Sequence, residues 1–145
     1  MDRALLEQLS PIQAIYISKS FCELMNAQSC DCNSIIIKSN NQFLHITYHP
    51  CGEDGYLVWN PLTCFNVEEY PYEVHLEDNL FIFDRISYTD NNLVEGIRFS
   101  ANDVYLFLFS SDDCLILTMS KIDLFEDEQM DFPEQEAVLK ISVRK

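Results

Sequence analysis

Two apolar runs in the second half of the chain constrain the fold most. Val104–Phe109 and Leu115–Met119 are almost continuously apolar, and the polar sequence Ser-Ser-Asp-Asp separates them at positions 110–113. A strand with one face in water would alternate apolar and polar residues, and these two runs do not alternate. We therefore expect a central β-hairpin in a sheet that is covered on one face by a second sheet and on the other by a helix.

Shorter runs of β-branched and aromatic residues fill most of the remaining chain and are separated by turn residues. They span Ser34–Lys38, Phe43–Tyr48, Tyr56–Trp59, Thr63–Val67, Tyr72–Leu76, Leu80–Tyr88, Val94–Phe99 and Ala137–Val143. Short strands at this spacing are typical of an antiparallel β-sandwich or a barrel-like sheet. The predicted fold class is mainly β (α+β), with a β-rich body over about residues 34–143. A chain of 145 residues fits one domain, residues 1–145.

One helix is expected near the N-terminus. Ser10 can cap an amide, Pro11 suits the first helical position, and Gln13 stands where a capping box places it. The apolar residues that follow predict a helix over about residues 11–27, packed on the sheet.

Negative charge is concentrated in the middle and at the end of the chain. The formal net charge is −15, and the segment Glu53–Glu136 holds 20 acidic residues against Arg85, Arg98 and Lys121. Such asymmetry steers oppositely charged partners, so it predicts a basic partner. With nine Lys and Arg in all, the chain is not expected to bind nucleic acid directly, and an anionic lipid surface would repel it.

The N-terminal residues lack the basic and apolar regions of a secretion signal, and six cysteines are few for a disulfide framework. No stretch reaches the 18 to 20 apolar residues that span a bilayer. These features predict a cytoplasmic protein.

The sequence Glu-Glu-Tyr-Pro-Tyr-Glu at positions 68–73 is the most distinctive candidate for a binding edge. Aromatic rings supply contact area, and carboxylates receive Arg and Lys from a partner. The predicted partner-binding residues are Glu68, Glu69, Tyr70, Tyr72, Glu73, Glu77 and Asp78, followed by Glu53, Asp54 and Trp59. A solvated loop that keeps the protein soluble remains the alternative. A second acidic run, at positions 123–136, is open to both interpretations.

Catalytic and metal chemistry have weaker candidates. His45 and His49 share a face of one predicted strand, but no nucleophile motif accompanies them. Cys30 and Cys32 lack the second ligand pair of a structural zinc site. We therefore expect no catalytic residue, no metal and no cofactor.

The size, acidity, cytosolic character and lack of catalytic motifs resemble bacterial immunity proteins, in particular those paired with toxins of contact-dependent growth inhibition systems. This resemblance implies a cytoplasmic protein that forms a 1:1 complex with the toxin domain of a delivered effector and neutralises it. Such toxins are often nucleases, and one that acts on ribosomal RNA would suit the charge. Two alternatives stay open: a DNA-mimicking inhibitor of a host defence nuclease, and a hydrolytic enzyme that uses His45, His49 and nearby carboxylates.

Overall fold

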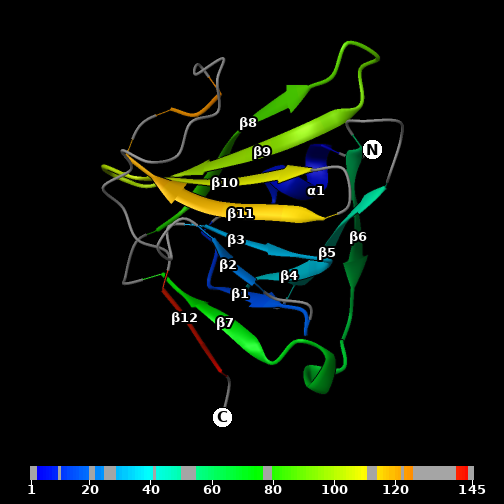
Figure 1. Cartoon of the computed structure of the whole chain (residues 1–145), viewed down its shortest axis with the longest axis vertical. Helices are drawn as coiled ribbons and strands as arrows, with labels where there is room; N and C mark the ends of the chain where they lie inside the picture. Colours follow the sequence, from blue (N-terminus) through cyan, green and yellow to red (C-terminus); the bar gives the residue numbers. More distant parts are fainter. Residues whose placement is uncertain are drawn as a thin grey trace.

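Two antiparallel sheets pack face to face in the computed structural model (Figure 1). The structure describes residues 3–9, 11–19, 22–24, 29–40, 42–49, 55–76, 80–110, 114–121, 123–125 and 140–143. None of the helices in these ranges has the length and apolar character needed to cross a bilayer. The β-rich fold class predicted from the sequence is confirmed.

Sheet A has the strand order β12-β7-β1-β4-β5-β6, with every neighbouring pair antiparallel. Its strands are β1 (Ala14–Ile17), β4 (Ser34–Ser39), β5 (Gln42–His49), β6 (Tyr56–Leu62), β7 (Tyr72–His75) and β12 (Lys140–Val143). Strand β6 continues through Pro61, beyond the expected Trp59. Proline is tolerated there because β6 is an edge strand, where a missing N–H need not break a ladder bond.

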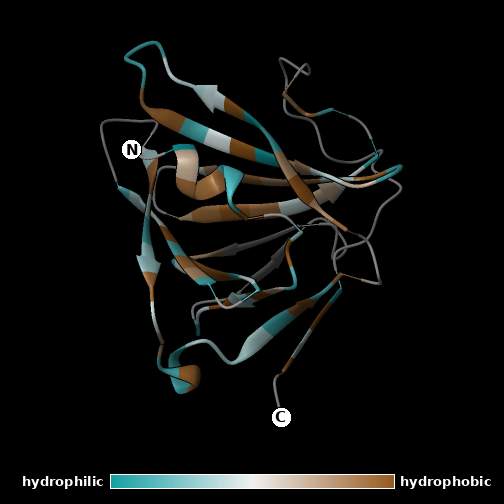
Figure 2. Ribbon diagram, turned by 180° about the vertical axis from the view of Figure 1, so that it is seen from behind, coloured by the Kyte–Doolittle hydropathy of each residue, from teal (hydrophilic) through white to brown (hydrophobic). Residues whose placement is uncertain are grey.

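Sheet B has the order β2-β3-β11-β10-β9-β8 and is also antiparallel. Its strands are β2 (Cys22–Leu24), β3 (Ser29–Cys32), β8 (Ile82–Tyr88), β9 (Val94–Ser100), β10 (Tyr105–Ser110) and β11 (Leu115–Ser120). The short helix α1 (Arg3–Glu7) lies between the two sheets at one end of the sandwich (Figure 2).

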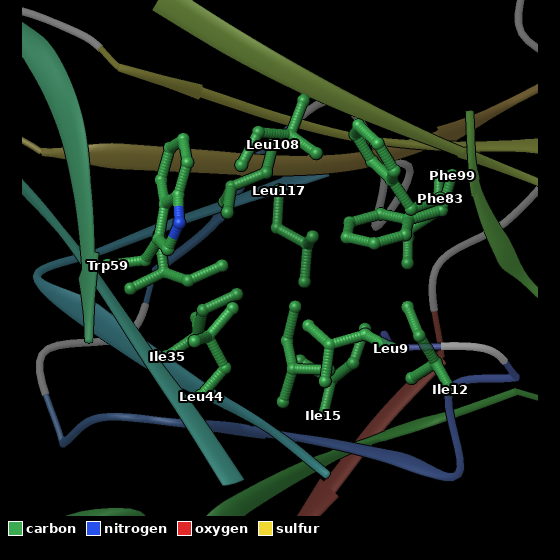
Figure 3. Packing of buried hydrophobic residues seen from close by; sticks show 14 of the residues in the cluster. Leu9, Ile12, Ile15, Ile35, Leu44, Trp59, Phe83, Phe99, Leu108 and Leu117 are labelled. Carbon is green, nitrogen blue, oxygen red and sulfur yellow. The ribbon is translucent and has the colours of Figure 1, made fainter. Parts of the chain in front are cut away.

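The main core lies between the sheets. Alternate residues of the central strands point into it, among them Ile35 from β4 and Leu108 and Leu117 from the hairpin β10–β11 (Figure 3). Leu6 of α1 and Leu9, which follows it, are at most 2% exposed and close one end of this core. Burial of this apolar surface drives the packing of the two sheets.

The outer face of sheet B is covered as well. Phe107 and Phe109 point away from the main core and pack with Leu124 and Phe125. Gly96 makes this packing possible, because a Cβ at this position would lie 2.9 Å from Cδ1 of Phe109. Burial of the hairpin on both faces is thus confirmed. The outer cover is the segment around Leu124, however, and not the expected helix.

The outer face of sheet A carries a second small cluster. Tyr16 of β1 and Ile36 of β4 point outward there and are covered by Phe65 and Tyr70, which precede β7. Both sheets are therefore buried on two faces over their central strands.

The helix predicted over residues 11–27 is wrong. Residues 14–17 form β1 and residues 22–24 form β2, while the helical residues lie earlier, in α1. Ile15 and Ile17 enter the main core and Ala14 and Tyr16 enter the outer cluster of sheet A. A short run that is buried on both faces is apolar throughout, so its pattern does not distinguish a central strand from a helix.

Candidate partner-binding surface

The segment that precedes β7 forms a capped turn and not the strand expected over Thr63–Val67. A single turn of 3₁₀ helix, η2, spans Val67–Glu69, and we call these three residues the acidic turn. The side-chain oxygen of Asn66 accepts a hydrogen bond from the N–H of Glu68 at 3.0 Å. Asparagine at this position satisfies an amide that the turn leaves without an acceptor, so it ends the extended chain and fixes the turn.

Tyr70 fastens the acidic turn to sheet A. Its side chain is only 9% exposed, and its hydroxyl lies 2.9 Å from the hydroxyl of Ser34, within hydrogen-bonding distance. The Tyr70 ring meets Phe65 edge to face at 5.7 Å between centroids. The backbone carbonyl of Glu69 accepts a hydrogen bond from the N–H of Lys19 at 3.1 Å. Tyr70 was predicted as a contact residue, but its burial gives it the role of an anchor.

The side chains of the acidic turn face water. Glu68 and Glu69 are exposed, and Val67 between them and the cap is 53% exposed. In the part of the chain that the structure describes, neither carboxylate forms an ion pair. The turn therefore presents two carboxylates that have no ion pair among the described residues, beside an exposed apolar side chain.

Tyr72 and Glu73 stand on β7, directly after the turn. Both are half-buried, and Tyr72 packs against the main core. Glu73 lies opposite Tyr16 on one neighbouring strand and opposite Ser142 on the other. The structure thus brings Glu68, Glu69 and Glu73 to one region at the β7 side of sheet A, where η2 adjoins the start of β7 (Figure 1).

Trp59 is part of the main core and not of the surface. Its side chain is 5% exposed and points between the sheets (Figure 3). Together with Tyr56, Tyr88 and Leu93 it lines a largely apolar cavity of about 290 Å³ between β6 and the hairpin β8–β9. The remaining predicted contact residues lie outside the described residues: Glu53, Asp54, Glu77 and Asp78.

Near the outer face of sheet B, arginines pair with Asp84 of β8 and with Asp123, which follows β11. The guanidinium of Arg98 donates to Asp84 and to Asp123, each at 2.7 Å. It also lies 4.9 Å from the ring centroid of Tyr105. Partial burial acts to lower the pKa of Arg98, but the two hydrogen bonds and charges outweigh it and raise the pKa. Arg85 lies 4.0 Å from Asp123. Sequence reasoning missed this network because its charged members come from three separate segments, β8, β9 and the residues after β11.

The two histidines of the enzyme hypothesis are placed among aromatic rings. His45 lies edge to face with Tyr70 at 6.4 Å between ring centroids, and burial lowers the pKa of His45. His49 stacks on Tyr56 at 5.1 Å. Within the described ranges, no group of three or more His, Cys, Asp or Glu side chains is arranged to hold a metal ion.

Comparisons with known proteins give no relative. No family model matches the chain, and neither a curated protein nor a solved structure is significantly similar to it. The functional argument therefore depends on the residues and their geometry.

Proposed function

We propose that this protein is a cytoplasmic immunity protein that binds a cognate toxin domain and neutralises it. The toxin is a basic nuclease that acts on ribosomal RNA or on another RNA. One observation carries the proposal: Glu68 and Glu69 are exposed on a capped turn, without an ion-pair partner among the described residues.

The acidic turn has the features of a preformed contact. Its backbone is held by the Asn66 cap and by the buried ring of Tyr70, so binding orders few additional groups. The exposed side chain of Val67 supplies apolar contact area beside the charges. Rigid presentation of charge and apolar area together favours a specific protein partner over a purely solvating role.

The chemical basis of inhibition is occlusion of an RNA-binding surface. A nuclease holds the phosphates of its substrate with Lys and Arg, and carboxylates of this chain compete for the same cations. Opposite charges steer the encounter, with association rates of roughly 10⁸ to 10⁹ M⁻¹ s⁻¹ at low salt. Fast association protects the cell because a free nuclease cleaves many substrates before a slow inhibitor arrives.

The proposed contact set contains the residues predicted from the sequence, and two of them are buried. Glu68 and Glu69 form its exposed centre, and the half-buried Glu73 continues it along β7, while Tyr72 packs against the main core. Tyr70 supports the turn and Trp59 supports the core. Glu53, Asp54, Glu77 and Asp78 belong to the proposed set through their place in the sequence.

A growth assay tests the function. Cells would express the protein that the gene immediately upstream of the gene for this chain encodes, as the candidate toxin, with and without the chain itself. In cells that express the toxin, we expect growth and intact ribosomal RNA only when the chain is expressed too. Cell death in the presence of the folded chain would overturn the proposal. Retrieval of a host defence nuclease by the immobilised chain would instead support the DNA-mimic alternative.

A further inference from the structure

The outer edge of β7 and the strand that covers it carry a second proposal. We propose that this edge is the docking site for a cationic β-strand. In the unbound protein the site is occupied by the chain's own C-terminal strand, β12, and in the complex a strand of the partner replaces it. The identity of that partner rests on the proposed function, whereas the docking site itself rests on the geometry of sheet A.

Among the strands that the structure describes, β12 pairs with β7 alone. Its four residues pair with the four residues of β7, from Lys140 opposite His75 to Val143 opposite Tyr72. Three of the four β12 residues are exposed, and only Ile141 is half-buried against the main core. Both views place β12 at the border of the molecule beside β7 (Figures 1 and 2). The strand is therefore a short edge element with little buried surface to hold it.

Strand β7 keeps its place in the sheet when β12 leaves. On its other side it pairs with β1, through Tyr72 opposite Ile17, Glu73 opposite Tyr16 and Val74 opposite Ile15. Removal of β12 would uncover the backbone edge of β7 and the buried side chain of Val74. Unpaired backbone groups and an uncovered apolar side chain both favour the binding of another strand.

The charges define which strand fits. Lys140 stands on β12, and Arg144 and Lys145 follow it in the sequence, so three of the chain's nine basic residues lie in its last six positions. Lys140 lies opposite His75 of β7. Strand β7 also carries Glu73 and directly follows the exposed Glu68 and Glu69. A strand that binds at this edge meets carboxylates, so cationic side chains complement it.

The register also shows where a partner strand can bind better than β12. Ile141 lies opposite Val74 on the inner side, so an apolar residue is required there. On the outer side Ser142 lies opposite Glu73, and its hydroxyl is 2.6 Å from Nε2 of His75. Arg or Lys in place of this serine would put a cation directly opposite the carboxylate, and such cross-strand pairs stabilise a sheet. A partner strand with this exchange would compete with β12 better than one that keeps the serine.

Synthetic peptides added to a shortened chain, residues 1–139, test the docking site without any toxin. One peptide has the sequence of the last six residues, Lys-Ile-Ser-Val-Arg-Lys, and a second has Arg in place of Ser. We expect both to shift the NMR signals of β7 amides, with the Arg peptide binding about two- to fivefold more tightly. Glu73→Gln in the shortened chain should abolish that difference, and the full chain should bind both peptides at least tenfold more weakly.

Two outcomes would overturn the proposal. A folded shortened chain whose β7 signals do not respond to either peptide, or respond equally to a scrambled peptide of the same composition, removes the docking site. If the shortened chain does not fold, hydrogen exchange on the full chain decides: amides of β12 should exchange at least tenfold faster than those of β4, and equal rates contradict a replaceable strand. Peptide binding by a chain that protects against no toxin would refute the proposed function alone.

Discussion

The outer faces of the two sheets are buried in the same way, but the carboxylates beside them differ in their ion pairs. Each face is covered by a short aromatic segment, with Phe65 and Tyr70 on sheet A and Leu124 and Phe125 on sheet B. On sheet B the neighbouring carboxylates are held by Arg98 and Arg85. On sheet A the carboxylates of the acidic turn form no ion pair with any described residue.

This difference separates structural charge from charge that is open to a partner. The ion pairs around Arg98 are partly shielded, with side-chain exposures of 16% for Arg98 and 21% for Asp123, so they contribute to stability. Exposed acids without a counter-ion contribute little to stability and raise the self-repulsion of a chain with net charge −15. Their position on an anchored turn therefore supports the proposed role in binding.

The largest expected effect tests whether the cluster on the outer face of sheet B is packed tightly enough to stabilise the fold. Phe107→Ala should lower the free energy of unfolding by about 3–5 kcal/mol, because Phe107 is fully buried under Phe125. Ile36→Ala is the matched change on sheet A, with about 2–5 kcal/mol expected. Chemical denaturation measures both. A loss below about 1 kcal/mol for Phe107→Ala would show that the outer cover is loose.

The next largest effect is expected for the ion pairs of Arg98. Arg98→Met should cost about 2–3 kcal/mol, less than for a fully buried pair, because it leaves Asp84 and Asp123 without their cation. Arg3→Met is the control, since the Arg3–Glu7 pair is more than half exposed and should contribute only about 0.3–0.5 kcal/mol. Equal losses in denaturation experiments would contradict a special role for Arg98.

A smaller effect is expected at the anchor of the acidic turn. Tyr70→Phe keeps the buried ring but removes the hydrogen bond to Ser34, which should cost about 0.5–1.5 kcal/mol. Tyr88→Phe is a suitable control because Tyr88 is 49% exposed, and a change within about 0.5 kcal/mol is expected. If both variants unfold at the same denaturant concentration as the wild type, Tyr70 does not anchor the turn through its hydroxyl.

The smallest expected effect is a pH dependence of the free energy of unfolding that comes from His45 on sheet A. Burial lowers the pKa of His45 below its ordinary value of about 6.5, so the unfolded chain binds this proton more readily than the folded one. Stability due to neutral His45 is complete above pH 6.5 and is lost as the pH falls through the folded-state pKa. His45→Gln should flatten this part of the stability profile, and an unchanged slope would assign it to other groups.

The fold was largely predictable from the sequence, and its exceptions have physical reasons. The hairpin β10–β11 was found because its apolar runs reflect burial on both faces. The same property misled the assignment of Ala14–Ile17, because a doubly covered strand of four residues has no alternation to distinguish it from a helix.

The candidate site was only partly predictable. Local composition located Glu68 and Glu69, but it could not show that Tyr70 turns inward, because that depends on Ser34, which lies 36 positions earlier. Burial of Trp59 depends likewise on a second sheet that composition does not place. Local sequence thus predicts charge, while the direction of an aromatic side chain is set by distant contacts.

The most direct test of the central claim compares two charge reversals of equal size. Glu68→Lys with Glu69→Lys alters the acidic turn, whereas Asp90→Lys with Asp103→Lys alters exposed acids in the β8–β9 and β9–β10 connections. Calorimetric titration of each variant with the toxin domain should show affinity at least about tenfold weaker for the first pair and within about twofold of wild type for the second. Equal losses for the two pairs, or no loss for the first, would contradict the assignment of binding to the acidic turn.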